Sequence, residues 1–205
     1  MCGIVGFFSR RAGRRGDFAE TLKLIHHRGP DDSGIWQDDY IQLGSTRLAI
    51  LDLSALGHQP MVHREGRNSI VFNGEIYNYL EVRTELESLN HRFLSRTDTE
   101  VLLAAFVEWG VDCLQKLRGM FVFAVWDTKK QILFLARDRV GEKPLYYWHD
   151  GDSFCFASEL KALLSFLPHK LALDPIAVDL YLHYQYVPEP RTPLSGVYKL
   201  PAAHY

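Results

Sequence analysis

Two strongly apolar runs separated by a short polar turn constrain the fold of this chain more than any other feature. Residues 121–126 read Phe-Val-Phe-Ala-Val-Trp and residues 132–136 read Ile-Leu-Phe-Leu-Ala, with Asp-Thr-Lys-Lys-Gln between them. Aromatic and β-branched residues favour strands, and a short polar connection joins neighbouring antiparallel strands. The pattern predicts a buried β-hairpin at 121–136, which requires a sheet with antiparallel strands.

Other segments show strand or helix character without a regular strand–helix repeat. We predict strands at 4–8, 34–37, 41–45, 47–51, 69–73, 145–148 and 153–157, and helices at 18–27, 77–89, 99–109 and 176–184, with a short helix from Glu159. Strands in runs and helices in groups are typical of an α+β fold with antiparallel sheets, not of a doubly wound parallel sheet. Thr97, followed three residues later by Glu100, predicts a reciprocal capping box at the helix near residue 99.

Composition excludes several classes of function. The chain has 205 residues, 47% of them hydrophobic, which suffices for a full core in one large domain. Its net charge of -2 and scattered basic residues give no footprint for nucleic acid. No apolar run approaches the ~18 residues that cross a bilayer, and the amino terminus lacks the charge order of an export signal. Three cysteines without C-x-x-C spacing favour a reducing, cytoplasmic setting.

The usual motifs for metals and nucleotides are missing from the sequence. Its nine histidines show neither H-E-x-x-H nor another ligand-like spacing, so no metal site is predicted. There is also no G-x-x-x-x-G-K-[ST], G-x-G-x-x-G or G-x-S-x-G motif. The residues therefore give no place for ATP and no serine nucleophile.

Cys2 is the candidate nucleophile. If Met1 is removed, this residue carries both a thiol and a free α-amine. An α-amine titrates near ~7.7 to 8.0 and a thiol near ~8.5, so at neutral pH each is close to the form that nucleophilic catalysis needs. A cysteine at position two is equally compatible with an ordinary first strand, so this interpretation depends on the other residues.

Three further segments carry polar residues with more than one interpretation. Asn73-Gly74 between apolar runs is typical of a hairpin turn, whereas the helical character after Glu75 favours a strand-to-helix junction, where the Asn73 amide and the Gly74 N–H could form an oxyanion hole. Arg47 can be a buried arginine paired with a carboxylate, and Asp98 can be a helix amino-terminal carboxylate. Together with Glu75 they supply one cation and two anions, the set that binds the carboxylate and ammonium of an amino acid.

Several motifs in order resemble the glutaminase domain of class II glutamine amidotransferases. They are MCGIVG at 1–6, RGPD at 28–31, RLAI at 47–50, FNGEIYN at 72–78 and TDTE at 97–100. Within that group, RGMF at 118–121, RDRVGEKPLYY at 137–147 and ASELK at 157–161 resemble glutamine-hydrolysing asparagine synthetases. The resemblance spans nearly the whole chain.

This resemblance implies the fold of amino-terminal-nucleophile hydrolases, a four-layer αββα sandwich of two antiparallel sheets. It implies that Cys2, after loss of Met1, attacks the side-chain amide of L-glutamine, and that Asn73 and Gly74 bind the oxyanion. Arg47 is then expected to bind the substrate carboxylate and Asp98 its ammonium. The remaining residues expected in the pocket are Leu48, Ala49, Ile50, Leu51 and Glu75.

The amidotransferase domain is predicted to span residues 1–187, with the proline-rich residues 188–205 as a connector. The chain is expected to be the front portion of a longer protein. The resemblance implies a synthetase domain or subunit that receives the ammonia and binds ATP and Mg²⁺, with no cofactor in this domain. A catalytically silent glutamine-binding or scaffold role, a different carboxylate acceptor, and a homodimer remain open.

Overall fold

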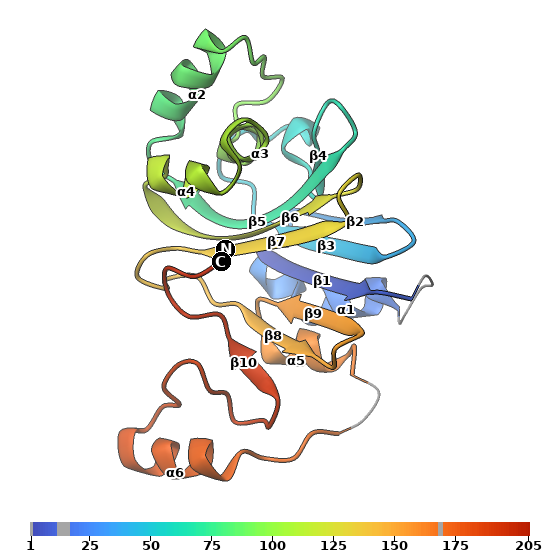
Figure 1. Cartoon of the computed structure of the whole chain (residues 1–205), viewed down its shortest axis with the longest axis vertical. Coiled ribbons are helices and arrows are strands. Elements are labelled where there is room, and N and C mark those ends of the chain that lie inside the picture. The colour runs from blue at the N-terminus through green and yellow to red at the C-terminus, as the bar shows by residue number, and fades with distance from the viewer. Residues whose placement is uncertain (1, 12–16, 168–169) are drawn as a thin grey trace.

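The structure is a computed structural model that describes residues 2–11, 17–167 and 170–205, and its strands form two antiparallel sheets (Figure 1). The six-stranded sheet has the order β10-β8-β9-β1-β3-β2, and the four-stranded sheet has the order β4-β5-β6-β7. The strands are β1 (Gly3–Ser9), β2 (Asp32–Gln37), β3 (Ile41–Arg47), β4 (Met61–Val62), β5 (Asn68–Ile76), β6 (Gly119–Asp127), β7 (Ile132–Arg137), β8 (Tyr146–His149), β9 (Ser153–Ala157) and β10 (Val197–Lys199).

Helices cover the outer face of each sheet (Figure 1). They are α2 (Tyr79–Ser88), α3 (Asp98–Trp109) and α4 (Cys113–Lys116) on the four-stranded sheet, and α1 (Phe18–Leu24) and α5 (Leu160–Leu164) on the six-stranded sheet, whereas α6 (Pro175–Tyr184) lies apart from both sheets (Figure 1). Carboxylates or a hydroxyl cap three of them: Asp17 caps α1, Thr97 caps α3, and Asp174 caps α6 ahead of Pro175. In each case the side-chain oxygen accepts a backbone N–H that the first turn would otherwise leave unpaired.

Three apolar cores separate the four layers. Leu102 of α3 and Phe123 of β6 belong to the core between the helices α2–α4 and the four-stranded sheet. Ile4 and Val122 belong to the core between the two sheets, and Leu163 of α5 belongs to the core beneath the six-stranded sheet. The predicted α+β fold, a four-layer αββα sandwich, is confirmed.

The predicted hairpin at 121–136 is present as β6 and β7. Its turn is fixed by Asp127, whose Oδ1 accepts the backbone N–H groups of Lys129 and Lys130 at 3.0 and 2.9 Å. Gln131 then adopts a left-handed conformation with φ of 53°, which returns the chain into β7. The Arg67 guanidinium donates to both Asp127 oxygens and holds the pKa of this carboxyl below its usual range.

The predicted strand at 47–51 is wrong, because the chain leaves the sheet after Arg47. The Arg47 guanidinium donates to the backbone carbonyls of Leu51 at 3.1 Å and Ser54 at 3.2 Å, and also to that of Asp52. These bonds fold residues 48–54 back over their own arginine instead of letting them pair with a neighbouring strand. Apolar alternation alone could not reveal this use of the backbone carbonyls.

Asn73-Gly74 forms neither of the two predicted structures. Both residues lie inside β5, paired with Val122 and Phe121 of β6, and the helix α2 begins only at Tyr79. Gly74 is required by this pairing, because a Cβ there would overlap the carbonyl oxygen of Met120.

The helix at 18–27 also ends earlier than predicted. It stops at Leu24 and continues as a 3₁₀ turn at His26–Arg28.

Only half of the predicted capping box forms. The Thr97 hydroxyl accepts the Glu100 N–H at 3.2 Å, as predicted. The Glu100 carboxylate instead accepts the N–H groups of Leu94 and Ser95, at 2.9 and 2.7 Å, and not that of Thr97. It therefore fixes the loop before α3, whereas the motif implies a bond to the N-cap residue itself.

The predicted connector at 188–205 packs against the domain. Its strand β10 extends the six-stranded sheet by pairing with β8, where Tyr198 faces Tyr147. Arg137 at the end of β7 donates to Glu189 Oε1 at 2.6 Å and to the Leu200 carbonyl oxygen. The boundary at residue 187 stays a prediction, but the packing of the domain continues past it. The strands β10 and β4 are both too short to show the alternation of residues from which a strand can be predicted.

Candidate active site

One cavity collects nearly all of the residues that the sequence singled out. It lies where the beginning of β1, the end of β3, the middle of β5 and the first turn of α3 meet. Nine of the ten predicted residues line it: Cys2, Arg47, Leu48, Ile50, Leu51, Asn73, Gly74, Glu75 and Asp98. Ala49 is the exception, because its backbone N–H points to the Asp31 carboxylate, which accepts it at 2.8 Å.

Cys2 lies immediately before β1 and is half-buried at the edge of the cavity. Its Sγ lies 3.8 Å from the Leu48 carbonyl oxygen, to which the thiol donates. Its own carbonyl oxygen accepts Nε–H of Arg28 at 3.0 Å. The other two cysteines, Cys113 and Cys155, are buried in apolar surroundings that raise the pKa of each thiol to about 12, so Cys2 has the more reactive position.

Asn73 presents a buried amide that nothing in the described residues satisfies. The residue is 1% exposed, and neither its Nδ2 nor its Oδ1 has a hydrogen-bond partner within the described ranges. An unpaired buried amide costs about 1–3 kcal/mol, so native structures keep one mainly where a ligand completes it. Because Asn73 also lines the cavity with Cys2, its amide is available to a bound molecule.

The backbone of β5 turns the N–H of Gly74 toward the same cavity. The N–H groups of Phe72 and Ile76 leave the sheet on one edge, donating to Gln59 Oε1 at 2.7 Å and to Asp98 Oδ2 at 3.0 Å. Backbone N–H groups two residues apart in a strand point to the same edge. The Gly74 N–H therefore points between these two bonds, and Gly74 lines the cavity there.

Asp98 is a buried carboxylate without a cation. It is 6% exposed at the start of α3, and no lysine, arginine or histidine in the described part of the chain forms an ion pair with it. Burial raises its pKa to about 6, and the nearby charge of Glu75 acts in the same direction, against the hydrogen bond from Ile76 N–H. A carboxylate in this state gains most from a cationic group entering the cavity.

Arg47 is buried, but the carboxylate partner that a purely structural arginine would have is absent from the described residues. Its guanidinium donates to the backbone carbonyls of residues 51, 52 and 54, which carry no net charge. The chain approaches so closely here that a Cβ at Gly57 would overlap the guanidinium. Among the described residues neither Arg47 nor Asp98 forms a direct ion pair, so the cavity offers one cation and one anion to a ligand.

The comparisons with known proteins identify the family. A family model described as "Glutamine amidotransferase domain" matches residues 1–205. The chain belongs to this family. Asparagine synthetase [glutamine-hydrolyzing] 1 of Bacillus subtilis is 41% identical over 197 residues, covering 94% of this chain and 31% of that protein. The putative asparagine synthetase 2 of Methanocaldococcus jannaschii is 40% identical over 225 residues, covering 98% and 43%.

A relative with a different name is similar along the whole glutamine amidotransferase domain. Amidase chry2 of Gibberella zeae is 36% identical over 220 residues, covering 100% of this chain and 32% of that protein. The chain therefore spans between 31% and 43% of the length of these curated relatives. The resemblance of its motifs to glutamine-hydrolysing asparagine synthetases is confirmed.

Solved structures support the fold of the glutamine amidotransferase domain. The glutamine phosphoribosylpyrophosphate amidotransferase of B. subtilis, complexed with ADP and GMP, superposes with a TM-score of 0.65 over 80% of this chain and 43% of that one. Its sequence identity is 20%, so this likeness concerns the architecture alone.

Two residues of the cavity wall were not predicted from the sequence. Gln59 is 4% exposed; its Oε1 accepts Phe72 N–H, and its Nε2 donates to the Thr99 hydroxyl at 3.3 Å. It thereby fixes β5 to the first turn of α3, and no spacing in the sequence indicates this. Lys143, which is 4% exposed, also lines the cavity, and it lies within a motif that was identified without a role for this residue.

Asp52 fixes the far end of the loop that carries Ile50 and Leu51. It adopts a left-handed backbone conformation with φ of 54°, and its carboxylate accepts the Ser54 hydroxyl at 2.6 Å and the Arg96 N–H at 2.8 Å. These hydrogen bonds lower its pKa to about 2. Asp31 and Asp52 together hold the loop over the cavity.

The described residues contain no group of three or more histidine, cysteine, aspartate and glutamate side chains that could hold a metal ion. The expectation that this domain uses no metal stays a prediction. Within the same residues, no helix has the length and apolar character needed to span a bilayer.

Proposed function

We propose that this domain hydrolyses the side-chain amide of L-glutamine to glutamate and ammonia through a thioester on Cys2. The observation that supports this most directly is the buried, unpaired amide of Asn73 in the same cavity as the Cys2 thiol. Such an amide suits a negative oxygen that exists only during the reaction, because the free protein leaves it unsatisfied.

The substrate would be held at both ends of the cavity. Arg47 supplies the cation for the α-carboxylate, and Asp98 supplies the anion for the α-ammonium. A pair of unit charges about 4 Å apart at an effective dielectric near 20 is worth roughly 4 kcal/mol before desolvation. Two such pairs distinguish glutamine from amides that lack the amino-acid group, and they place the scissile carbon at Cys2.

The covalent steps balance with the groups of Cys2 alone. Once Met1 has been removed, the α-amine takes the thiol proton while the sulfur attacks the amide carbon and the carbonyl electrons move to oxygen. The Asn73 amide and the Gly74 N–H stabilise this oxyanion. The intermediate collapses, the C–N bond breaks, and the α-ammonium returns its proton to the departing ammonia. Water then attacks the thioester in the same way and releases glutamate.

The ammonia acceptor is proposed from the relatives. Their names describe glutamine-hydrolysing asparagine synthetases, so we place an ATP- and Mg²⁺-dependent synthetase domain or subunit next to this one as the consumer of the ammonia. This domain itself needs no cofactor in the proposal, and a cytoplasmic setting suits its free thiols. Asparagine formation is favoured over amidation of another carboxylate because several relatives share that name.

The test is glutamate formation from glutamine by the purified chain. Cys2→Ala should abolish it, and intact-mass measurement should show that Met1 is absent from the active protein. Glutamine binding measured by calorimetry without glutamate production would favour the alternative of a silent glutamine-binding domain. Equal activity in Cys2→Ala would refute the mechanism.

A further inference from the structure

The residue that carries the nucleophile lies outside the sheet and needs its own anchor. The first pairing of β1 joins Gly3 to Thr46, so Cys2 precedes the ladder. The ends of chains are poorly ordered unless contacts tie them down. Cys2 is held through its carbonyl oxygen, which accepts Nε–H of Arg28 at 3.0 Å. This bond orients the peptide plane from which the Cys2 Cα, and hence both the thiol and the amine, extend.

The Arg28 side chain is in turn held by Glu159. Nη1 of Arg28 lies 3.0 Å from Glu159 Oε1, in a pair whose side chains are 11% and 23% exposed. Fixing an arginine side chain costs rotamer entropy. A single hydrogen bond to a backbone carbonyl compensates little of this cost and therefore restrains the guanidinium weakly. A partly buried charge pair restrains it better, because turning away would leave the guanidinium of Arg28 without its carboxylate partner.

The residue before Glu159 fixes the strand next to the nucleophile. The Ser158 N–H donates to the Ile4 carbonyl oxygen at 2.9 Å, and the Ile4 N–H donates to the Ser158 hydroxyl at 3.0 Å. Ser158 therefore fixes β1 two residues after Cys2, while Glu159 reaches Cys2 itself through Arg28. Gly3, between Cys2 and Ile4, has no room for a Cβ, which would lie 2.8 Å from Ile25 Cδ1 and Thr46 Oγ1 and 3.3 Å from Arg28 Cδ.

We propose that Glu159 is a positioning residue for the nucleophile, acting through Arg28 on the Cys2 peptide. The proposal rests on the proposed glutaminase function and adds a residue that touches neither substrate nor sulfur. The substrate-binding groups Arg47 and Asp98 lie on β3 and α3, so Glu159 acts on the rate of the chemical step and not on glutamine binding.

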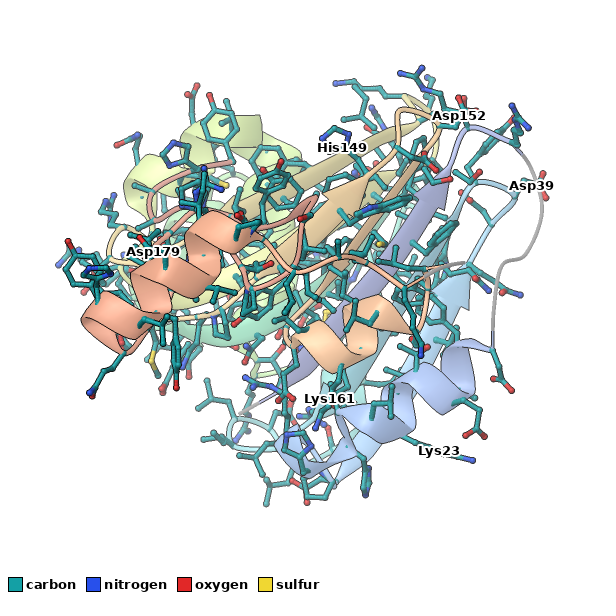
Figure 2. The ribbon with its side chains drawn as sticks, turned by 90° about the horizontal axis from the view of Figure 1, so that it is seen from below. Lys23, Asp39, His149, Asp152, Lys161 and Asp179 are labelled. Carbon is teal, nitrogen blue, oxygen red and sulfur yellow. The ribbon has the colours of Figure 1, made fainter. Side chains whose placement is uncertain are left out.

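Lys161 offers a matched control. Its Nζ lies 3.2 Å from Glu159 Oε2, whereas His27 Nε2 binds Oε1 at 2.9 Å. Lys161 belongs to α5 and lies on the same side of the molecule as Lys23 of α1 (Figure 2). Lys161→Met removes one partner of Glu159 and leaves its bond to Arg28.

The first experiment compares steady-state kinetics of Glu159→Gln and Lys161→Met. Displacing a reacting group by about 1 Å can cost on the order of 100-fold in rate, so we expect Glu159→Gln to lower kcat by roughly 10- to 100-fold with little change in KM. Lys161→Met should keep the wild-type kcat. A wild-type kcat in Glu159→Gln, or an equal loss in Lys161→Met, would overturn the proposal.

A double-mutant cycle separates positioning from a general structural role. If Glu159 acts through Arg28, the double variant Arg28→Met/Glu159→Gln loses no more kcat than Arg28→Met alone. Additive losses would show that Glu159 acts by another route. Thermal unfolding of each variant checks that the comparison is made on folded protein.

A measurement without glutamine distinguishes failure of this proposal from failure of the proposed function. We expect the amide proton of Gly3, measured by NMR, to exchange about tenfold faster in Glu159→Gln than in the wild type and to stay unchanged in Lys161→Met. A wild-type protein that forms no glutamate refutes the glutaminase function, and this exchange still reports on the anchor. Unchanged exchange in Glu159→Gln would overturn the anchor itself.

Discussion

Asp98→Asn should weaken glutamine binding and leave the turnover rate at saturation largely intact. The substitution keeps an oxygen that can accept the Ile76 N–H, and it removes the negative charge. A hydrogen bond to a charged group contributes about 1.5–3 kcal/mol, which corresponds to binding that is roughly 10- to 150-fold weaker. Because the lost contact lies at the α-ammonium, away from the scissile bond, the effect belongs in KM.

The pH dependence of binding gives a second measure of the same group. Burial raises the pKa of Asp98 to about 6 in the free protein, and only the ionised form attracts an ammonium. At about pH 5 roughly a tenth of the molecules would carry the charge, so the apparent dissociation constant should be about tenfold larger than at about pH 8. Asp98→Asn should bind weakly at both values.

The stability of the folded protein should fall as pH rises, whereas its affinity for glutamine should increase. The folded pKa of about 6 lies above the ordinary value of 3.8, so the folded protein binds more protons between these values than the unfolded chain. The free energy of unfolding therefore falls as pH rises through this window, by about 3 kcal/mol at most. Asp98→Asn removes this cost, and we expect its Tm at about pH 8 to equal or exceed that of the wild type.

The assay is calorimetric titration of glutamine into Cys2→Ala, alone and combined with Asp98→Asn, from about pH 5 to pH 8. The alanine background prevents turnover during the titration. Glu75→Gln is the matched comparison, because Glu75 is the other carboxylate in the cavity. The reasoning would be refuted if Asp98→Asn bound glutamine as tightly as its parent, or if Glu75→Gln alone removed the pH dependence.

Three substitutions test the other parts of the cavity. Asn73→Ala should lower kcat by about 10²- to 10³-fold with little change in KM, because its amide serves the oxyanion. Gly74→Ala should lower Tm in thermal unfolding, since the new Cβ would overlap the Met120 carbonyl oxygen; an unchanged Tm would contradict the packing. Asp31→Asn should raise KM for glutamine by loosening the loop at Ala49, and a wild-type KM would show that this anchor is dispensable.

The sequence predicted the layers of the fold because their periodicity is strong. The apolar run of β6 is buried inside the four-stranded sheet, as predicted, whereas β7 is an edge strand in which Ile132 is exposed and the next three residues are only partly buried. Local structure was predicted poorly where a side chain binds backbone groups several residues away. Arg47 takes the carbonyls of the following loop, so an apolar run that looks like a strand becomes a cavity wall.

The candidate site could be predicted in composition but not in geometry. The sequence indicated nine residues that line one cavity. Asn73 and Gly74, however, present their donors to this cavity from inside β5, whereas their residue types predicted a turn or a strand-to-helix junction. Gln59 and Glu159 could not be assigned a role from the sequence, because each acts through residues distant along the chain. Their functions follow only from contacts that the fold creates.

The most direct test of the central claim is to trap the acyl-enzyme. The chain is mixed with glutamine, quenched in acid, digested and analysed by mass spectrometry. We expect the peptide that begins at Cys2, without Met1, to carry a glutamyl group on sulfur, and Asn73→Ala to accumulate less of it at early times. Turnover of glutamine by a protein that retains Met1, or a glutamyl group found on another residue, would contradict the account.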